Sequence, residues 1–239
     1  MSRRLDVALA ARQVGEVVTG DSTPIVALGA ALVLLPALAS AVVPHGHSIG
    51  TVLAVLSGLG AALFVTLVSF GTMERLAGRP LELRRYVRRG IVASPPGFST
   101  ALLLGTGGVA LAIVRLIGGG NGLVAGLAGG TMAAGLIALL PAVPLALSER
   151  CSPFRAVRAS YALTRPAFGR IAMLLAGAAV GVVPAGLMIG GPGDGGLPSG
   201  RLWLWLLFEL LAAGVLATLP GVVHAQLAPH RPRPMIYRE

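Results

Sequence analysis

One acidic residue lies deep inside an apolar stretch of the sequence. Glu209 is the sole charged residue between positions 202 and 223, and at a helical rise of 1.5 Å per residue it would lie about 10 Å inside a membrane span. A carboxylate at that depth needs a partner or a proton. Arg115, near the end of another apolar stretch, is the basic residue that we expect to pair with it. We favour a structural pair, and the alternative makes Glu209 a proton or substrate site.

Other residues capable of chemistry lie apart from one another in sequence. His45 and His47 could share a metal ion, but no Asp, Glu or Cys lies near them, so we expect a polar turn without metal. Cys151 is the single cysteine and has no histidine beside it, which predicts a free thiol. All 19 basic residues are arginine, which excludes Schiff-base lysines and Walker A loops. We therefore expect no catalytic residues, no metal and no cofactor.

The elements that carry these residues follow from composition. Of 239 residues, 55 % are hydrophobic and 12 % are charged, and the mean hydropathy is +0.82. A soluble domain has about a quarter charged residues, so this chain is predicted to be an all-α polytopic membrane bundle in one domain, residues 1–239. The apolar runs are continuous, as in helices rather than barrel strands. We place six transmembrane helices near residues 25–43, 49–70, 98–117, 123–146, 171–190 and 202–223.

Amphipathic segments precede the first, third and fifth spans. Residues 1–24 are predicted to form an interfacial helix, because charged residues interrupt what would be the core of a signal peptide. Its expected apolar face consists of Val7, Ala10, Ala11, Val14, Val17 and Val18. Ser152 and Pro153 form a helix start, and Pro166 ends that helix. Within span four, Pro141 and Pro144 predict a bend or an early end.

Arginine placement predicts the orientation. Seventeen of the 19 arginines lie in the segments before span one, between spans two and three, between spans four and five, and in the tail, residues 224–239. Basic residues in short loops remain in the cytoplasm, so both termini are expected inside a bacterial cytoplasmic (inner) membrane. The net charge of +10 and pI of 11.6 suit anionic lipid headgroups as partners. Nucleic acid is not expected, because no aromatic residues are interleaved with the arginines as stacking platforms.

The two arginine-rich inner loops repeat one pattern. Glu74-Arg75 and Glu149-Arg150 are 75 positions apart, as are Tyr86 and Tyr161, and the next equivalent position holds His224. We therefore interpret the chain as three units, each an interfacial helix followed by two spans. Units with an even number of spans would be related by an axis along the membrane normal.

Small and aromatic residues have expected positions within the spans. Glycines recur every four residues and are predicted to pack helices closely inside the monomer. They are Gly122, Gly126 and Gly130 in span four and Gly177 and Gly181 in span five. Trp203 and Trp205, beside Arg201, are predicted to be interfacial anchors at the outer end of span six.

The stretch from Pro144 to Arg165 resembles the signature of a bacterial six-helix membrane family. The matching positions are Pro144, Glu149, Ser160, Leu163 and Arg165, and Pro166 departs from the glycine expected there. The family includes YciC-type inner-membrane proteins and the membrane domain of some glycerophosphodiester phosphodiesterases. The resemblance implies a membrane protein of envelope maintenance and supplies no catalytic residues.

Three classes of function are left open by the sequence. A non-enzymatic membrane protein for envelope maintenance or assembly, with an unidentified membrane-protein partner, fits best. A transporter with a polar site near Glu209 is the alternative, and it would need polar groups converging at mid-membrane. An intramembrane enzyme is the third, although no zinc-protease motif or nucleophile elbow occurs.

Overall fold

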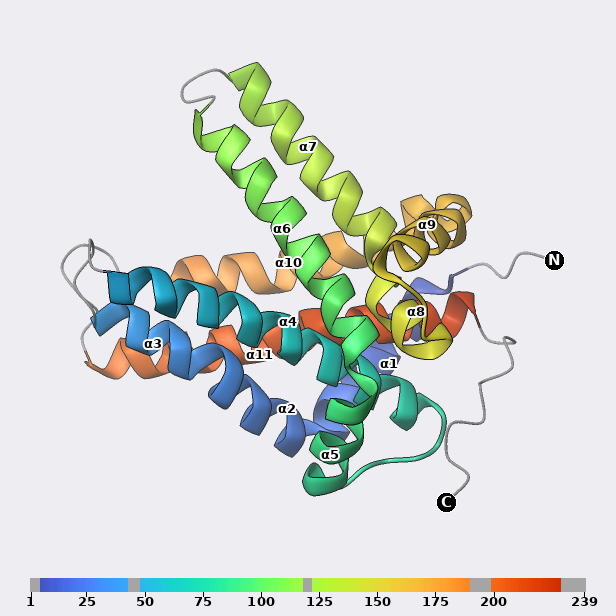
Figure 1. Cartoon of the computed structure of the whole chain (residues 1–239). Helices are drawn as coiled ribbons and strands as arrows, with labels where there is room; N and C mark the ends of the chain where they lie inside the picture. Colours follow the sequence, from blue (N-terminus) through green and yellow to red (C-terminus); the bar gives the residue numbers. More distant parts are fainter. Residues whose placement is uncertain (1–4, 43–47, 118–121, 190–198, 229–239) are drawn as a thin grey trace.

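A computed structural model describes residues 5–42, 48–117, 122–189 and 199–228 of the chain (Figure 1). Every regular element in these ranges is helical. In chain order they are α1 (Val7–Gly20), α2 (Ser22–Gly29), the π-helix η1 (Ala30–Leu34), α3 (Leu35–Val42), α4 (Ser48–Leu76), α5 (Leu83–Ala93), α6 (Pro95–Ile117), α7 (Gly122–Leu139), α8 (Ala142–Glu149), α9 (Pro153–Thr164), the 3-10 helix η2 (Arg165–Ala167), α10 (Phe168–Ile189) and α11 (Ser199–Leu227).

Five helical segments are long and apolar enough to cross a membrane, and a sixth is obtained if a bent pair of helices counts as one span. The bent pair joins Val7–Gly20 to Ser22–Leu34 at an angle of 76°. These segments establish a multi-pass, all-helical membrane protein by length and composition, as the continuous apolar runs predicted. Helices α2, η1 and α3 cover most of the predicted first span, residues 25–43, but the bent pair ends at Leu34, so a single span here stays a prediction.

The centre of the bundle is formed by the last helix of each predicted unit. Helix α11 packs most extensively against α4, and α8 contacts both of them. Buried apolar side chains on these helices include Phe64 and Leu67 of α4, Leu145 of α8, and Leu219 and Val222 of α11. Helices α6 and α7 form a hairpin whose far end leaves the bundle, while α3, α4, α10 and α11 stay together (Figure 1).

The proline break predicted in span four is confirmed. Helix α7 ends at Leu139 and α8 begins at Ala142, with Pro141 between them as the residue preceding α8. Proline lacks an amide hydrogen and clashes with the preceding turn, which explains the interruption. Pro144 falls in the first turn of α8, where a missing amide donor costs little. The helix start at Ser152 and Pro153 is confirmed as well, since α9 begins at Pro153.

Each short helix packs against the end of the unit before it. Helix α5 lies on α4, α9 lies on α8 and α7, and α1 closes the cycle by lying on α11 and α10. The three-unit interpretation of the sequence predicted the order of these elements. The repeat pattern did not specify that each short helix packs on the preceding unit, with α1 packing on the last one.

Helix α1 buries most of the face expected to be apolar, whereas α9 buries its small side chains instead of its large ones. Helix α1 buries Ala10, Val14 and Val17 of its predicted apolar face against protein, whereas Ala11 is exposed. In α9 the buried residues are Ala156, Ser160 and Thr164, and the large side chains of Phe154 and Tyr161 point outward. Small side chains allow α9 to approach α7 and α8 closely, which places the bulky ones on the outside.

The glycine prediction requires a correction. The prediction places Gly122, Gly126, Gly130 and Gly177 against helices of the same chain. Within the described residues, however, a Cβ at any of these glycines would have no atom within 4 Å, apart from its chain neighbours and the backbone of its own helix. The reason is the departure of the hairpin from the bundle, which leaves the glycines of α7 without an intramolecular neighbour. The surroundings of Gly181 lie outside the described residues.

Candidate functional site

An acidic side chain is buried where α1 turns into α2. Asp21 ends α1 and precedes α2, with its amide bonded to the carbonyl of Val17 at 2.8 Å and its own carbonyl accepting from Ile25 at 3.0 Å. Its side chain is 5 % exposed. A buried carboxylate requires a countercharge or a proton, so this joint is the first position at which to look for a site.

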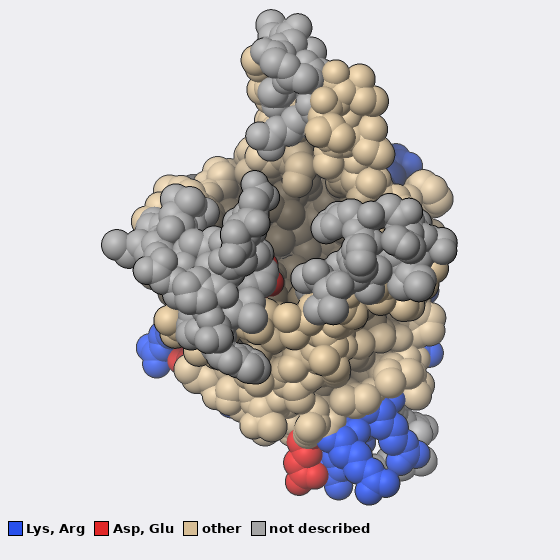
Figure 2. Space-filling view, turned by 90° about the vertical axis from the view of Figure 1, so that its left-hand side faces the viewer, with Lys and Arg blue, Asp and Glu red and all other residues tan. Residues whose placement is uncertain are grey.

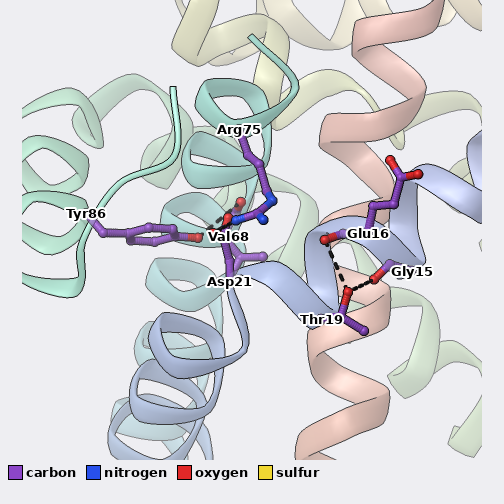
Figure 3. A network of polar contacts seen from close by, with 7 residues as sticks. All are labelled: Gly15, Glu16, Thr19, Asp21, Val68, Arg75 and Tyr86. Atoms are coloured by element: carbon purple, nitrogen blue, oxygen red, sulfur yellow. Dashed lines mark hydrogen bonds and ion pairs between the residues drawn. The ribbon is translucent and has the colours of Figure 1, made fainter. Parts of the chain in front are cut away.

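The countercharge is Arg75, from the last turn of α4. Its Nη1 donates a hydrogen bond to Oδ1 of Asp21 (Figure 3). The guanidinium lies against the backbone of Gly20, where a Cβ would overlap Nη2 and Cζ. Glycine at this position therefore lets the cation reach the buried carboxylate. Burial raises the pKa of Asp21 above its ordinary value, and the charge and hydrogen bond of Arg75 oppose this rise.

An aromatic side chain from α5 completes the group. Tyr86 is 1 % exposed, and its hydroxyl donates to the carbonyl of Val68 at 3.5 Å (Figure 3). Its ring occupies the space that a side chain at Gly71 would need. Burial, with a smaller contribution from the negative charge of Asp21, raises the pKa of the Tyr86 hydroxyl. The hydroxyl is therefore neutral and cannot serve as a base at physiological pH.

Helix α1 is also attached to the third unit. Oε1 of Gln226 accepts a hydrogen bond from the amide of Asp6 at 3.1 Å, and Nε2 of Gln226 donates to Gln13 at 2.9 Å. Arg170 of α10 donates to the carbonyl of Leu5 at 3.1 Å. Together with the Asp21–Arg75 pair, these bonds fix both ends of α1 to the bundle.

Two hydroxyls of α9 satisfy one carbonyl at the end of α7. Ser160 Oγ and Thr164 Oγ1 each lie as donors 2.9 Å from the carbonyl oxygen of Ala138, and Thr164 Oγ1 also lies 3.0 Å from the carbonyl oxygen of Ser160. The last carbonyls of a helix have no partner within it, and in a buried setting each needs one from outside. Ser160, one of the positions that carries the family resemblance, therefore has a structural role. Of the other four, Pro144 is buried in α8, Glu149 and Leu163 are half-buried, and Arg165 is exposed.

The predicted pairing of Glu209 involves a residue whose side chain is not described. Glu209 is half-buried in α11. The side chains of Arg115, Trp203 and Trp205 are not among those described, and neither is the segment with His45 and His47. The far end of α6 points away from α11 (Figure 1). The pairing of Glu209 with Arg115 thus stays a prediction, as do the tryptophan anchors.

The surface is hollowed at the end of the bundle where α4 and α11 begin. Figure 2 shows a hollow between the protruding hairpin and the remaining helices, with acidic surface visible inside it. No group of three or more His, Cys, Asp or Glu within the described ranges could hold a metal ion. Cys151 is buried against Ala146 and Ala156.

The arrangement around Asp21 can hold helices together and present a cation, and it was not predicted from the sequence. A signal was nevertheless available. Asp21 and the pair Glu74-Arg75 flank the uncharged run of residues 22–73. Two spans return the chain to the same side of the membrane, so the charges that flank such a run must lie at the same level. Pairing between them was therefore a reasonable expectation.

Comparisons with protein-family models, with curated proteins and with solved structures find no match to this chain.

Proposed function

We propose that the chain is a six-span protein of the bacterial inner membrane, with both termini in the cytoplasm and with α1, α5 and α9 at the inner interface. The sidedness of the arginines supports this orientation, since most of them flank those three helices. The test is labelling of single cysteines in intact cells, in a background with Cys151→Ser. Arg88→Cys should resist a membrane-impermeant maleimide until the cells are opened. Labelling of intact cells at this position would overturn the topology.

The role that fits this architecture best is assembly or maintenance of the envelope without catalysis, through an unidentified membrane-protein partner. One observation carries the proposal, namely the α6–α7 hairpin that leaves the bundle. Its exposed apolar residues include Val109 at 59 %, Leu127 at 65 % and Leu136 at 56 %. Glycines on α7 would allow another helix to approach its backbone closely. The resemblance of residues 144–165 to YciC-type proteins agrees with this role.

Photo-crosslinking in living cells tests the assembly role. A photoreactive residue at Leu127 or Leu136 of α7 should give one protein adduct of fixed mass, and Gly126→Leu should suppress it by filling the approach surface. Leu207 of α11, which is 53 % exposed, is the matched control and should give none. Protein adducts that are absent at α7, or equal at α7 and Leu207, would contradict the proposal.

A transporter-like role is the second candidate, favoured by the hollow with acidic surface in Figure 2. Glu209, in the first half of α11, would be its polar site. If water enters the hollow in the membrane, the variant Glu209→Cys, in the Cys151→Ser background, should react with a small water-soluble thiol reagent applied from outside. Protection of the introduced thiol in intact and in opened cells would exclude an aqueous path to this position and would leave the assembly role.

A further inference from the structure

A cavity of about 470 Å³ opens beside the Asp21–Arg75 pair, on the side of α1 that faces the end of α4. Its volume is in the range of pockets that bind small molecules. The cavity is lined by Glu16, Val17, Thr19, Gly20, Arg75 and Leu76. It therefore combines one cation, one anion and two apolar side chains at the level where a predicted span ends.

Arg75 has hydrogen-bond donors to spare for a ligand. The guanidinium carries five N–H groups, and within the described part of the chain one of its nitrogens, Nη1, is bonded to Asp21. The side chain is 29 % exposed and lines the cavity, so the guanidinium is open to a ligand on that side. Asp21 and Gly20 hold the group in place from two sides, so little conformational entropy is lost when it binds an anion. A planar, pre-positioned guanidinium is well suited to two oxygens of a phosphate.

Glu16 supplies the opposite charge on the same cavity. Its side chain is 58 % exposed, and its Oε1 accepts a hydrogen bond from Arg12 at 2.9 Å. This bond is solvated and lies within one helix, so it leaves Oε2 available to a second donor. The hydroxyl proton of Thr19 is not available to a ligand, because it is donated to the carbonyl of Gly15 at 2.8 Å (Figure 3). A ligand that is only anionic would leave Oε2 of Glu16 without a donor, whereas a zwitterionic ligand could use both charges.

From these contacts we propose that the cavity binds the headgroup of a zwitterionic phospholipid that carries a primary ammonium, with the phosphate on Arg75 and the ammonium on Glu16. Leu76, which is half-buried, provides an apolar wall for the glycerol and the first methylenes of the acyl chains. A choline headgroup fits less well, because it has no N–H to donate to the carboxylate. The inference rests on the proposed membrane location of α1 and does not depend on the assembly role.

Native mass spectrometry of the full-length protein tests the proposal. The protein, in detergent, is given equal amounts of isotopically labelled phosphatidylethanolamine, phosphatidylglycerol and phosphatidylcholine. We expect phosphatidylethanolamine to be retained preferentially. Gly20→Ala should lower its retention about tenfold, because the new methyl group displaces the guanidinium from the phosphate position. Gly15→Ala is the matched control in the same helix, since nothing in the described residues lies within 4 Å of its Cβ.

Glu16→Gln tests the specificity without disturbing the buried pair. The exposed carboxylate is lost but the fold has no need of it, so we expect the ratio of phosphatidylethanolamine to phosphatidylglycerol to fall about tenfold. Glu82→Gln removes another exposed acid and should leave the ratio unchanged. Retention that is insensitive to Gly20→Ala, or a ratio that is insensitive to Glu16→Gln, would overturn the proposal.

Two further comparisons identify the ligand and its place. Glycerophosphoethanolamine has the same charged groups without acyl chains, and it should fail to displace the lipid even in large excess. Displacement at an equal concentration would assign the cavity to a soluble phosphodiester and overturn the lipid proposal.

A second cavity, of about 360 Å³, is lined by Leu5, Asp6, Val7, Arg170 and Met173. Loss of lipid with Arg170→Gln but not with Gly20→Ala would place the headgroup there and contradict the assignment to Arg75.

Discussion

Arg75 donates a hydrogen bond to the carboxylate of Asp21 across 54 positions of the sequence. The bond joins the end of the second predicted span to the start of the first. It is made at the 76° bend between α1 and the helices that follow it. The pair thus fixes the direction in which α1 leaves the bundle, and it determines the position of the cation on the cavity beside Glu16.

The first prediction concerns the stability of this pair. Arg75→Met should lower the free energy of unfolding by about 3 kcal/mol, because it leaves the buried carboxylate of Asp21 without its countercharge. The double variant Asp21→Asn with Arg75→Met should recover most of the loss, since the buried charge is then removed. Unfolding in mixed micelles, followed by circular dichroism, measures both. Losses that add in the double variant would show that the two residues act independently.

The second prediction concerns pH. Burial raises the pKa of Asp21 above 3.8 in the folded protein, so the folded state binds more protons than the unfolded state between 3.8 and the raised value. The contribution of Asp21 to stability is therefore fully present below pH 3.8 and is lost as the pH rises through the folded pKa. Arg75 opposes the rise, so Arg75→Gln should move this loss to higher pH. Asp21→Asn should abolish it, and an unchanged pH profile in Asp21→Asn would assign the titration to another group.

The third prediction compares two glycines. Gly71→Ala would place a methyl group inside the ring of Tyr86 and should cost about 1 to 3 kcal/mol, as overpacking does. Gly135→Ala, on the open α7, should change stability by no more than about 1 kcal/mol, because no described atom lies near its Cβ position and alanine favours helix. Thermal unfolding of both variants in one detergent makes the comparison. Equal effects would argue against the packing of α5 on α4.

The fourth prediction concerns the two hydroxyls on the carbonyl of Ala138. Ser160→Ala or Thr164→Val alone should cost less than about 1 kcal/mol, because the remaining hydroxyl still satisfies the oxygen. The double variant should cost more than the sum, since a buried carbonyl without a partner carries a penalty of about 1 to 3 kcal/mol. A double-mutant cycle in unfolding experiments measures the difference. Additive losses would contradict the shared acceptor.

Much of the fold could be predicted from the sequence because a membrane span requires a long run of apolar residues. Charge-free runs and the prolines at 141 and 166 locate helices and their ends without knowledge of tertiary contacts. Asp21, by contrast, was interpreted only as a charge unsuited to a signal peptide. Its partner depends on which helix faces meet, and helical periodicity does not specify this.

The glycines of α7 show a second limit of the sequence. Spacing every four residues indicates that a backbone can be approached closely, but it does not identify the helix that approaches. The expected partner is a helix of the same chain, whereas the described residues leave Gly126 and Gly130 open. The pattern therefore supports a capacity for close contact, and the described residues contain no helix that uses it at Gly126 or Gly130.

The last prediction concerns Glu209 and Arg115. In Figure 1 the far end of α6 points away from α11, so an ion pair between these residues requires the hairpin to approach the bundle. If the pair forms in the membrane, Glu209→Arg and Arg115→Glu should each lower the yield of folded protein, because an uncompensated charge in hydrocarbon is costly. Exchange of both charges should then restore the yield.

Fluorescence size-exclusion of tagged variants measures folded yield in the membrane fraction, with Arg12→Glu as a control for an exposed arginine. Rescue by the double exchange would mean that the hairpin closes onto α11, and the hollow beside it would then be smaller in the membrane than in Figure 2. Failure of the double exchange, together with tolerance of Glu209→Gln, would instead mean that Glu209 takes a proton rather than a partner. That outcome would favour a polar site open to the hollow, because a protonated carboxyl needs no arginine.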